Sequence, residues 1–314
     1  MQIPLALSPA GFAFDVVGFG STSVDLFAVL DAYPPNGSKQ RLRQHLRLPG
    51  GSTATALVGC QRLGWRTRFV GRLGGDDEGR LVRESLIAEG VGVHAHVVPG
   101  ARNQFAIILV DRESGERTVL WDRDAALDGS PEAIEREALV SGRILLVDAG
   151  DVPSATAAAA AARRHGVVTA IDIEQAGPGT TELLREIDLL VVAETFPSAI
   201  TGKAETGAAL HALAAELKPA LACVTLGAAG SLAICQGREI RTPGFPVRCT
   251  DTTGAGDAFR AGLLSGWLAQ PDADVADLLR RANAVAALNC RALGAWAGLP
   301  TASEIEHFLA AEGT

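Results

Sequence analysis

Short apolar segments alternate with helical patterns along most of the chain, and this alternation constrains the fold more than any other feature. The clearest apolar segments have the length and composition of buried strands: Phe14–Gly18, Arg143–Asp148, Val167–Asp172, Asp188–Val192 and Ala222–Gly227. The helical patterns cover Ser52–Leu63, Gly79–Gly90, Ser154–His165 and Asp274–Leu288. Strands and helices in this order predict a doubly wound α/β sheet covered by helices.

Two regions interrupt the alternation with patterns of antiparallel strands, at about residues 26–48 and 105–121. In the second region, apolar strands flank a turn at Ser114 and Gly115, which is typical of a β-hairpin. We expect the two insertions to form a small lid over the carboxyl edge of the main sheet, where α/β folds bind ligands. The alternative, that they are edge hairpins which extend the sheet or make a dimer contact, stays open.

The composition indicates a globular chain and argues against two kinds of partner. The 314 residues are 47% hydrophobic, yet no apolar run reaches the roughly 18 residues that cross a bilayer. The formal net charge of −8 argues against a nucleic-acid-binding surface. The scattered cysteines fit reduced thiols and predict a cytoplasmic protein: Cys60, Cys223, Cys235, Cys249 and Cys290. We interpret residues 1–314 as a single domain that carries the lid strands.

The segment Asp251–Phe259 combines two threonines, two closely spaced glycines and a carboxylate, and it leads directly into an apolar helical pattern. Glycines allow the backbone to approach an anion closely, and the N-terminus of a helix favours phosphate. A carboxylate repels that phosphate, so its presence calls for a chemical role. We interpret Asp257 as a general base that takes a proton from an attacking hydroxyl in a phosphoryl-transfer site. The alternative role for Asp257 is a helix N-cap.

Glycine-rich turns also follow strands in the first part of the chain. Gly18-Phe19-Gly20 only partly matches a dinucleotide-binding fingerprint, and the turn leads to Asp25, whose carboxylate suits the hydroxyls of a polyol. Gly50 and Gly51 precede a helix and allow a ligand to approach the backbone. The chain contains no Walker A motif, which argues against a P-loop NTPase.

Polar residues end three of the later strands. Asp148 and Asp172 are placed near the carboxyl edge, where either can orient a substrate hydroxyl or metal-bound water, or simply cap the next loop. Thr225 and Gly227 lie in a strand-and-turn segment that can contact a phosphate, although such a segment alone is more often structural.

Taken together and in this order, these segments resemble the ribokinase-type (PfkB) carbohydrate kinases from about Phe14 to the last helix. Asp251–Phe259 looks like the C-terminal signature of that family, and Gly50-Gly51 with the segment Gly71–Gly79 looks like its N-terminal signature. The resemblance implies a three-layer α/β/α sandwich with a β-sheet lid, and a homodimer through that lid. It also implies transfer of the γ-phosphoryl group of ATP to a sugar or nucleoside hydroxyl with Mg²⁺, and it leaves a requirement for K⁺ open.

The resemblance also implies roles for individual residues. Asp257 matches the catalytic base, and an anion hole for the transferring phosphoryl group is matched by Gly254, Ala255 and Gly256. The positions that match contacts to the sugar are Asp25, Gly50, Gly51 and Thr55. Many relatives carry asparagine where this chain has Thr55. Two residues before the lid hairpin are within reach of the substrate, Asn103 and Gln104. The nucleotide side is matched by Thr225, Gly227, Gly230, Thr252 and Asn283.

The chain departs from the family pattern after Val192, where the family's Asn-x-x-Glu motif is expected. The segment here is Ala193-Glu194-Thr195-Phe196, so the metal ligands stay unassigned. Some ketohexokinase-like and sulfofructose-kinase-like relatives also depart at this point. Arg260 lies at a variable position. Arg102 would favour an anionic sugar if it pointed inward, and it is otherwise a solvated loop residue.

These observations lead to one main hypothesis, an ATP-dependent kinase of a ketose-like polyol that uses Asp257 as its base. One alternative is a nucleoside kinase on the same fold, with Phe105 and Trp121 as a stacking surface. The other is a sugar- or nucleotide-binding protein that has lost catalysis, suggested by the altered segment Ala193–Phe196.

Overall fold

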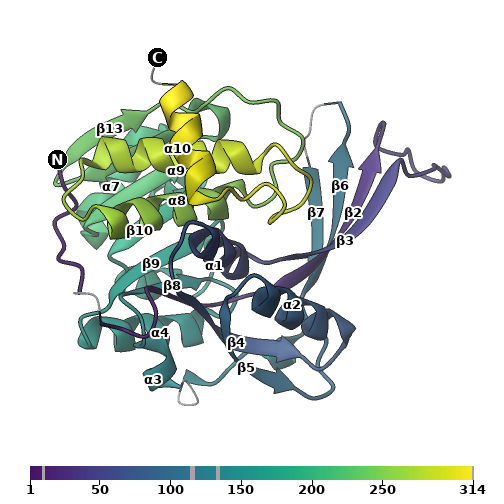
Figure 1. The fold of residues 1–314 in the computed structure, drawn as a ribbon, viewed down its shortest axis with the longest axis horizontal. Helices are drawn as coiled ribbons and strands as arrows, with labels where there is room; N and C mark the ends of the chain where they lie inside the picture. Colours follow the sequence, from purple (N-terminus) through teal and green to yellow (C-terminus); the bar gives the residue numbers. More distant parts are fainter. Residues whose placement is uncertain (9–10, 114–116, 132–134, 313–314) are drawn as a thin grey trace.

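A nine-stranded sheet forms the centre of the protein (Figure 1). The structure is a computed structural model that describes residues 1–8, 11–113, 117–131 and 135–312. From one edge to the other, the strands are β13 (Arg238–Thr242), β12 (Ser231–Cys235), β11 (Leu221–Thr225), β10 (Leu189–Ala193), β9 (Val168–Ile173), β8 (Ile144–Asp148), β1 (Val16–Phe19), β4 (Thr67–Gly74) and β5 (Gly92–Val98). The strands from β11 to β5 pair in parallel, and β12 and β13 add an antiparallel edge.

Helices cover both faces of this sheet, because alternate residues of its buried strands are apolar on either side. One face packs against α1 (Ser52–Arg62), α2 (Asp77–Ala88), α8 (Ala255–Ala269), α9 (Val275–Asn289) and α10 (Ala302–Ala311). The other face packs against α3 (Arg136–Leu139), α4 (Val152–Arg164), α5 (Thr180–Leu184), α6 (Phe196–Thr201) and α7 (Thr206–Leu217). Short 3₁₀ turns follow at η1 (Ala125–Leu127) and η3 (Gly227–Ala229). The predicted three-layer α/β/α sandwich is confirmed.

A separate four-stranded sheet extends from the main body, at the right of Figure 1. Its strand order is β3 (Gln44–Gly50), β2 (Ser23–Leu30), β6 (Phe105–Asp111) and β7 (Arg117–Asp122). Both predicted insertions are antiparallel pairs, but the sequence did not predict that β2 and β6 join them in parallel. The predicted turn at Ser114 and Gly115 lies outside the described residues. We call this four-stranded sheet the lid.

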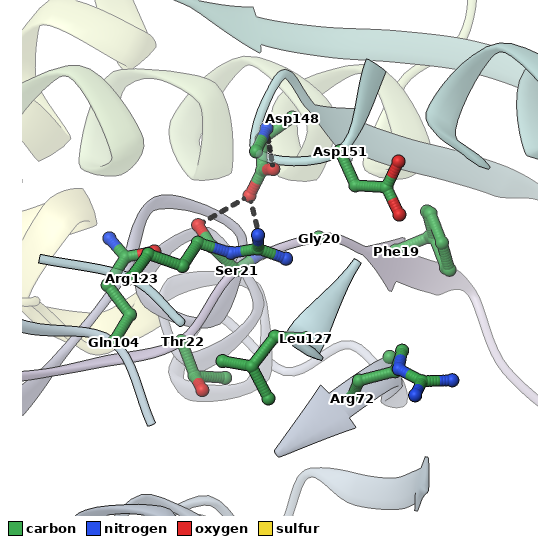
Figure 2. A pocket seen from close by; sticks show the side chains of 12 residues that line it. Phe19, Gly20, Ser21, Thr22, Arg72, Gln104, Arg123, Leu127, Asp148 and Asp151 are labelled. Carbon is green, nitrogen blue, oxygen red and sulfur yellow. Dashed lines mark hydrogen bonds between the residues drawn. The ribbon is translucent and has the colours of Figure 1, made fainter. Parts of the chain in front are cut away.

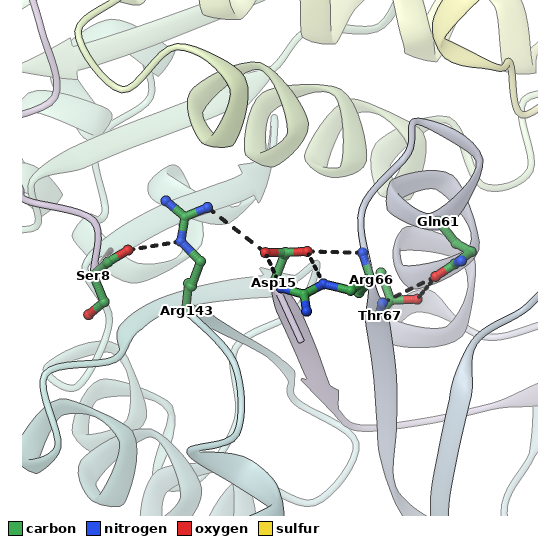
Figure 3. A network of polar contacts seen from close by, with 6 residues as sticks. All are labelled: Ser8, Asp15, Gln61, Arg66, Thr67 and Arg143. Atoms are coloured by element: carbon green, nitrogen blue, oxygen red, sulfur yellow. Dashed lines mark hydrogen bonds and ion pairs between the residues drawn. The ribbon is translucent and has the colours of Figure 1, made fainter. Parts of the chain in front are cut away.

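The opposite, amino edge of the main sheet is held by a polar network around Asp15 (Figure 3). The Asp15 carboxylate accepts hydrogen bonds from the backbone N–H and the Nε of Arg66, both at 3.1 Å. Arg143, which precedes β8, lies 3.9 Å from the same carboxylate and donates to the Ser8 carbonyl. These contacts tie the starts of β1, β4 and β8 together. No helix in the described ranges is long and apolar enough to cross a membrane.

Candidate active site

The helix that carries the predicted base begins in a turn that only glycine adopts easily. Gly254 is the N-cap of α8 with φ +75°, and a Cβ there would lie 3.0 Å from Ala295. The Ala255 N–H donates to the Thr252 carbonyl at 3.2 Å. Within the part of the chain that the structure describes, nothing accepts a hydrogen bond from the N–H groups of Gly256 and Asp257. These two donors and the positive end of the helix form a place for an anion.

The carboxylate of Asp251 stabilises this turn through hydrogen bonds to neighbouring residues. It is fully buried and accepts from the Thr253 N–H at 2.9 Å and from the Thr253 hydroxyl at 2.7 Å. Its second oxygen accepts from the Gly294 N–H at 2.8 Å. Because all three contacts are internal, Asp251 acts as a structural brace of the anion site.

Asp257 lies on the first turn of α8, next to the anion site. Its side chain is 14% exposed, and its Oδ1 lies 3.7 Å from Nη1 of Arg260. Burial raises the pKa of Asp257 well above the usual range; the neighbouring Asp172 adds to the rise and Arg260 opposes it. A carboxylate with a raised pKa is a better proton acceptor, so this environment suits a general base.

Asp25 and the glycine pair form a second part of the site. Asp25, on lid strand β2, is 4% exposed and accepts a hydrogen bond from the Ser23 hydroxyl at 2.7 Å. A Cβ on Gly50 would lie 2.7 Å from Cγ of Asp25, and one on Gly51, at φ +94°, would lie 2.5 Å from Cα of Thr22. Both positions therefore exclude larger residues. Burial is the main reason that the pKa of Asp25 rises to about 6.

Asp148, at the end of β8, organises the turn after β1 (Figure 2). One of its oxygens accepts from the Ser21 N–H at 2.6 Å, from the Ser21 hydroxyl at 2.8 Å and from Thr53 at 2.7 Å. The cavity beside it has a volume of about 30 Å³, which is room for one or two water molecules. The earlier interpretation of Asp148 as a residue at the carboxyl edge agrees with this position, where it orients Ser21 and Thr53.

Two predicted sugar contacts are already engaged inside the protein. Thr55 is fully buried, and its hydroxyl accepts a hydrogen bond from Nε1 of Trp296 at 2.9 Å. Asn103 is 2% exposed; its Oδ1 accepts from the Gly74 N–H at 3.1 Å, and its Nδ2 donates to the Gln104 carbonyl at 3.2 Å. Asn103 therefore connects β4 to the start of the lid.

The neighbours of Asn103 differ in orientation. Gln104 lines the small cavity beside Ser21 and Asp148 (Figure 2), near the place where the lid joins the main sheet. Arg102 is 66% exposed and pairs with Asp122 at 3.1 Å on the surface of the lid. The solvated-loop interpretation of Arg102 thus agrees with the structure, and Arg102 offers no support for an anionic sugar.

Four of the five predicted nucleotide contacts lie together at the antiparallel edge of the sheet, and the fifth, Thr252, lies in the turn before α8. Thr225 is the last residue of β11, and Gly227, at φ +55°, has open space around it. Gly230 is needed for a different reason, since a Cβ there would lie 2.5 Å from the Pro243 carbonyl carbon. Asn283 on α9 donates through Nδ2 to Ser231, Thr242 and Pro243 at 3.1–3.3 Å. Its donors are occupied, so only its carbonyl oxygen remains for a nucleotide.

The sequence reasoning missed Arg117, the first residue of β7. Its guanidinium reaches from the lid and donates a hydrogen bond to the Thr252 hydroxyl. Thr252 lies in the turn before α8, within the signature segment Asp251–Phe259, and we call this turn the signature turn. Its charge also lowers the pKa of Asp25, against the effect of burial. A pattern of alternating residues in a hairpin gives no signal for this contact, because the two segments lie 135 residues apart in the chain.

Comparisons with known proteins agree with this geometry. Residues 13–302 match the sequence profile of the pfkB family carbohydrate kinases. The chain belongs to the PfkB family. This PfkB kinase is 30% identical over 300 residues to a fructokinase of Escherichia coli. The alignment covers 89% of this chain and 96% of the fructokinase. It is also 27% identical over 296 residues to a ribokinase of Bacillus subtilis. That alignment covers 92% of this chain and 97% of the ribokinase.

A solved structure gives the same result in three dimensions. The ribokinase of Arabidopsis thaliana complexed with ribose and ATP has a TM-score of 0.82 and 27% identity, over 95% of this chain and 99% of that one. Family membership and these relatives show that the PfkB kinase is an ATP-dependent phosphotransferase that acts on a sugar.

The described residues of the PfkB kinase do not form a dedicated metal site. They contain no group of three or more His, Cys, Asp or Glu side chains that could hold an ion. After β10, Phe196 is 1% exposed and packs into the core, where it cannot contact a ligand. Mg²⁺ is usually held by substrate phosphates and water with one or two carboxylates. An ion that enters with the nucleotide needs no such group of side chains.

Proposed function

We propose that the protein phosphorylates a primary hydroxyl of a ketose-like sugar, with Asp257 as the general base. The single observation that carries the proposal is the position of Asp257. It lies on the first turn of α8, beside two backbone N–H groups that nothing else in the described chain uses. The second support is Asp25, a buried carboxylate on lid strand β2 that lies against Gly50, where a larger side chain would collide with it. Two fructokinases are among the relatives of 30–31% identity, which favours a ketose over an aldose.

In this mechanism each group has a separate task. Asp25 accepts hydrogen bonds from the sugar and orients it, and Asp257 takes the proton of the attacking hydroxyl. The new bond forms between that oxygen and the γ-phosphorus as the bond to the β-phosphate oxygen breaks, and ADP leaves. The free N–H groups of Gly256 and Asp257 at the start of α8 stabilise charge on the transferring group, in the anion hole whose turn Gly254 and Ala255 form. The lid keeps water from competing for the phosphoryl group.

The nucleotide is proposed to lie along Thr225, Gly227 and Gly230, with Thr252 and the carbonyl oxygen of Asn283 nearby. Mg²⁺ bound to ATP supplies charge neutralisation for phosphoryl transfer when present. A requirement for K⁺ stays a prediction, which the rate in potassium and in sodium buffers tests directly. The cytoplasmic location also stays a prediction.

The proposal is tested by measuring ATP consumption with Mg²⁺ over fructose, other ketoses, ribose, sugar acids and nucleosides. We expect one ketose to give the highest kcat/KM, and Asp257→Asn to lower kcat by about 10²–10⁴-fold. Sugar affinity, measured by calorimetry, should change little, because Asp257 acts on the proton and Asp25 on binding. Full activity of the Asp257→Asn variant would show that Asp257 is not the general base. A higher kcat/KM for ribose than for every ketose would show that the substrate is an aldose.

A nucleoside kinase is the second candidate because of Trp121. In the register of the lid, Trp121 pairs with Ala106, and Ala106 pairs with Asp25, so all three side chains lie on one face. The indole is 66% exposed there and is free to stack on a base. Turnover of adenosine above that of every sugar would favour this candidate. Turnover of any acceptor would exclude the alternative of an inactive binding protein.

We also propose a homodimer through the other face of the lid. Leu26, Ile107 and Leu120 are in register across three strands and are 37%, 38% and 54% exposed. An apolar row on a sheet face is a common site of association. Light scattering should give a dimer for the native chain and a monomer for Leu120→Glu, whereas Ile87→Glu, at an exposed residue of α2, should stay dimeric.

A further inference from the structure

A buried arginine connects the catalytic helix to the sheet beneath it. Arg260 on α8 is 5% exposed and forms an ion pair with Asp172, which is 6% exposed at the carboxyl end of β9. The same guanidinium donates from Nη2 to the Val191 carbonyl at 3.1 Å. Val191 on β10 and Asp172 on β9 are partners in the sheet, so Arg260 is held by two adjacent strands.

The other nitrogen of Arg260 faces the reaction centre. Its Nη1 lies 3.7 Å from Oδ1 of Asp257, one helical turn earlier. A Cβ on Gly256 would lie 3.0 Å from the same nitrogen, so the guanidinium packs directly against the anion-hole turn. Arg260 therefore lies between two carboxylates: Nη2 forms the ion pair with Asp172, and Nη1 faces Asp257.

The charges around Asp257 come from two elements. Asp172 and the exposed Glu174 approach it from the end of β9, and Arg260 approaches from α8 itself. The two acids disfavour ionised Asp257, and the guanidinium favours it. A base that were paired fully with arginine would hold its charge too firmly to accept a proton, and a base with no cation nearby would already be protonated.

We propose that Asp172 and Arg260 are positioning residues that set the proton affinity and the orientation of Asp257. Asp172 and the Val191 carbonyl hold the guanidinium at the edge of the site, so that its Nη1 lies 3.7 Å from Oδ1 of Asp257. Both residues act through Asp257 and not on the substrate directly. The inference rests on the proposed role of Asp257 as the base.

The arrangement predicts pH shifts of opposite sign for the two residues. Asp172→Asn removes a negative neighbour and frees Arg260 to pair with Asp257, so the pKa of the base falls. Arg260→Gln removes the positive neighbour and leaves two acids together, so the pKa of the base rises. We expect each variant to move the acidic limb of the kcat/KM profile by about 1 pH unit, to lower pH for Asp172→Asn and to higher pH for Arg260→Gln.

The experiment is the pH dependence of kcat/KM for the best sugar, from pH 4.5 to 9, for the native enzyme and both variants. Glu174→Gln is the matched control, since it removes an exposed carboxylate two residues from Asp172, and its shift should be clearly smaller than that of Asp172→Asn. Thermal unfolding at each pH separates a loss of fold from a shift of the profile. If Arg260→Gln does not fold, Arg260→Lys replaces it: the ammonium keeps the charge, so kcat should fall while the acidic limb stays in place.

Shifts in the same direction, or lower rates with no shift in either variant, would overturn the proposal and leave a purely structural ion pair. Failure of the base assignment is seen separately, because Asp257→Asn would then retain its turnover. In that case the acidic limb would persist in Asp257→Asn, and the effects of Asp172 and Arg260 would concern another group.

Discussion

Near neutral pH and without ligand, the ionised carboxyl of Asp25 is expected to lower the free energy of unfolding of the enzyme. Asp25 is 4% exposed, and its pKa rises from 3.8 to about 6, mainly because burial disfavours its charge. The folded state therefore holds a proton that the unfolded state loses at lower pH. A difference of about 2 pKa units corresponds to about 3 kcal/mol.

The sign of this effect fixes its pH dependence. The stability that comes from protonated Asp25 is fully present below about pH 4 and is lost as the pH rises through about 6. Asp25→Asn has no charge to lose, so we expect it to be more stable than the native chain by up to about 3 kcal/mol at pH 7.5. The gain should disappear near pH 4, since both chains are then uncharged at this position.

The assay is urea unfolding of both chains, without ligand, at several pH values from 4 to 8. The Ser23 hydroxyl, which donates to Oδ1 of Asp25, can donate to the amide oxygen in the same way, so this hydrogen bond is kept in the variant. The same variant should lose most of its sugar affinity, because an amide accepts fewer hydroxyl hydrogen bonds. A stability difference that is absent, or that does not change with pH, would refute the reasoning.

Two further predictions concern the shape of the site. Gly50→Ala places a methyl group 2.7 Å from Cγ of Asp25, so KM for the sugar should rise at least about 10-fold, while Gly177→Ala, which meets nothing within 4 Å, should leave kinetics unchanged. An unaltered KM in Gly50→Ala would show that Asp25 moves without cost. Thr55→Val leaves the buried indole N–H of Trp296 without its acceptor and should cost about 1–3 kcal/mol in urea unfolding. Thr55→Ser keeps the hydroxyl and should cost less; equal losses in the two variants would mean that packing, and not the hydrogen bond, matters.

The sequence determined the layers and the location of the catalytic turn. Apolar strands and helical patterns are local features, and they predicted β8 to β11 and α1 to within two or three residues. Asp251–Phe259 carried its own signal, because a glycine turn before a helix has the same meaning wherever it lies. The position of Asp257 in the first turn of α8 therefore followed from the chain alone.

The tertiary structure decided which polar side chains remain available for a ligand. Asn103, Asn283 and Thr55 looked like ligand contacts in the sequence, yet each is bonded to a segment that the pattern does not place beside it. Arg117 and Arg260 looked like ordinary residues of a hairpin and a helix. In the structure, Arg117 donates to Thr252 in the signature turn, and Arg260 forms a buried ion pair with Asp172.

The physical reason is the range of the interactions. Hydrophobic periodicity and turn chemistry act over a few neighbouring residues, so the sequence shows them directly. The hydrogen bonds and ion pairs of buried polar groups join residues such as Thr55 and Trp296, which lie 241 positions apart. Only the folded chain brings such groups together, and only then is it decided which of them hold the site in shape and which can act on a substrate.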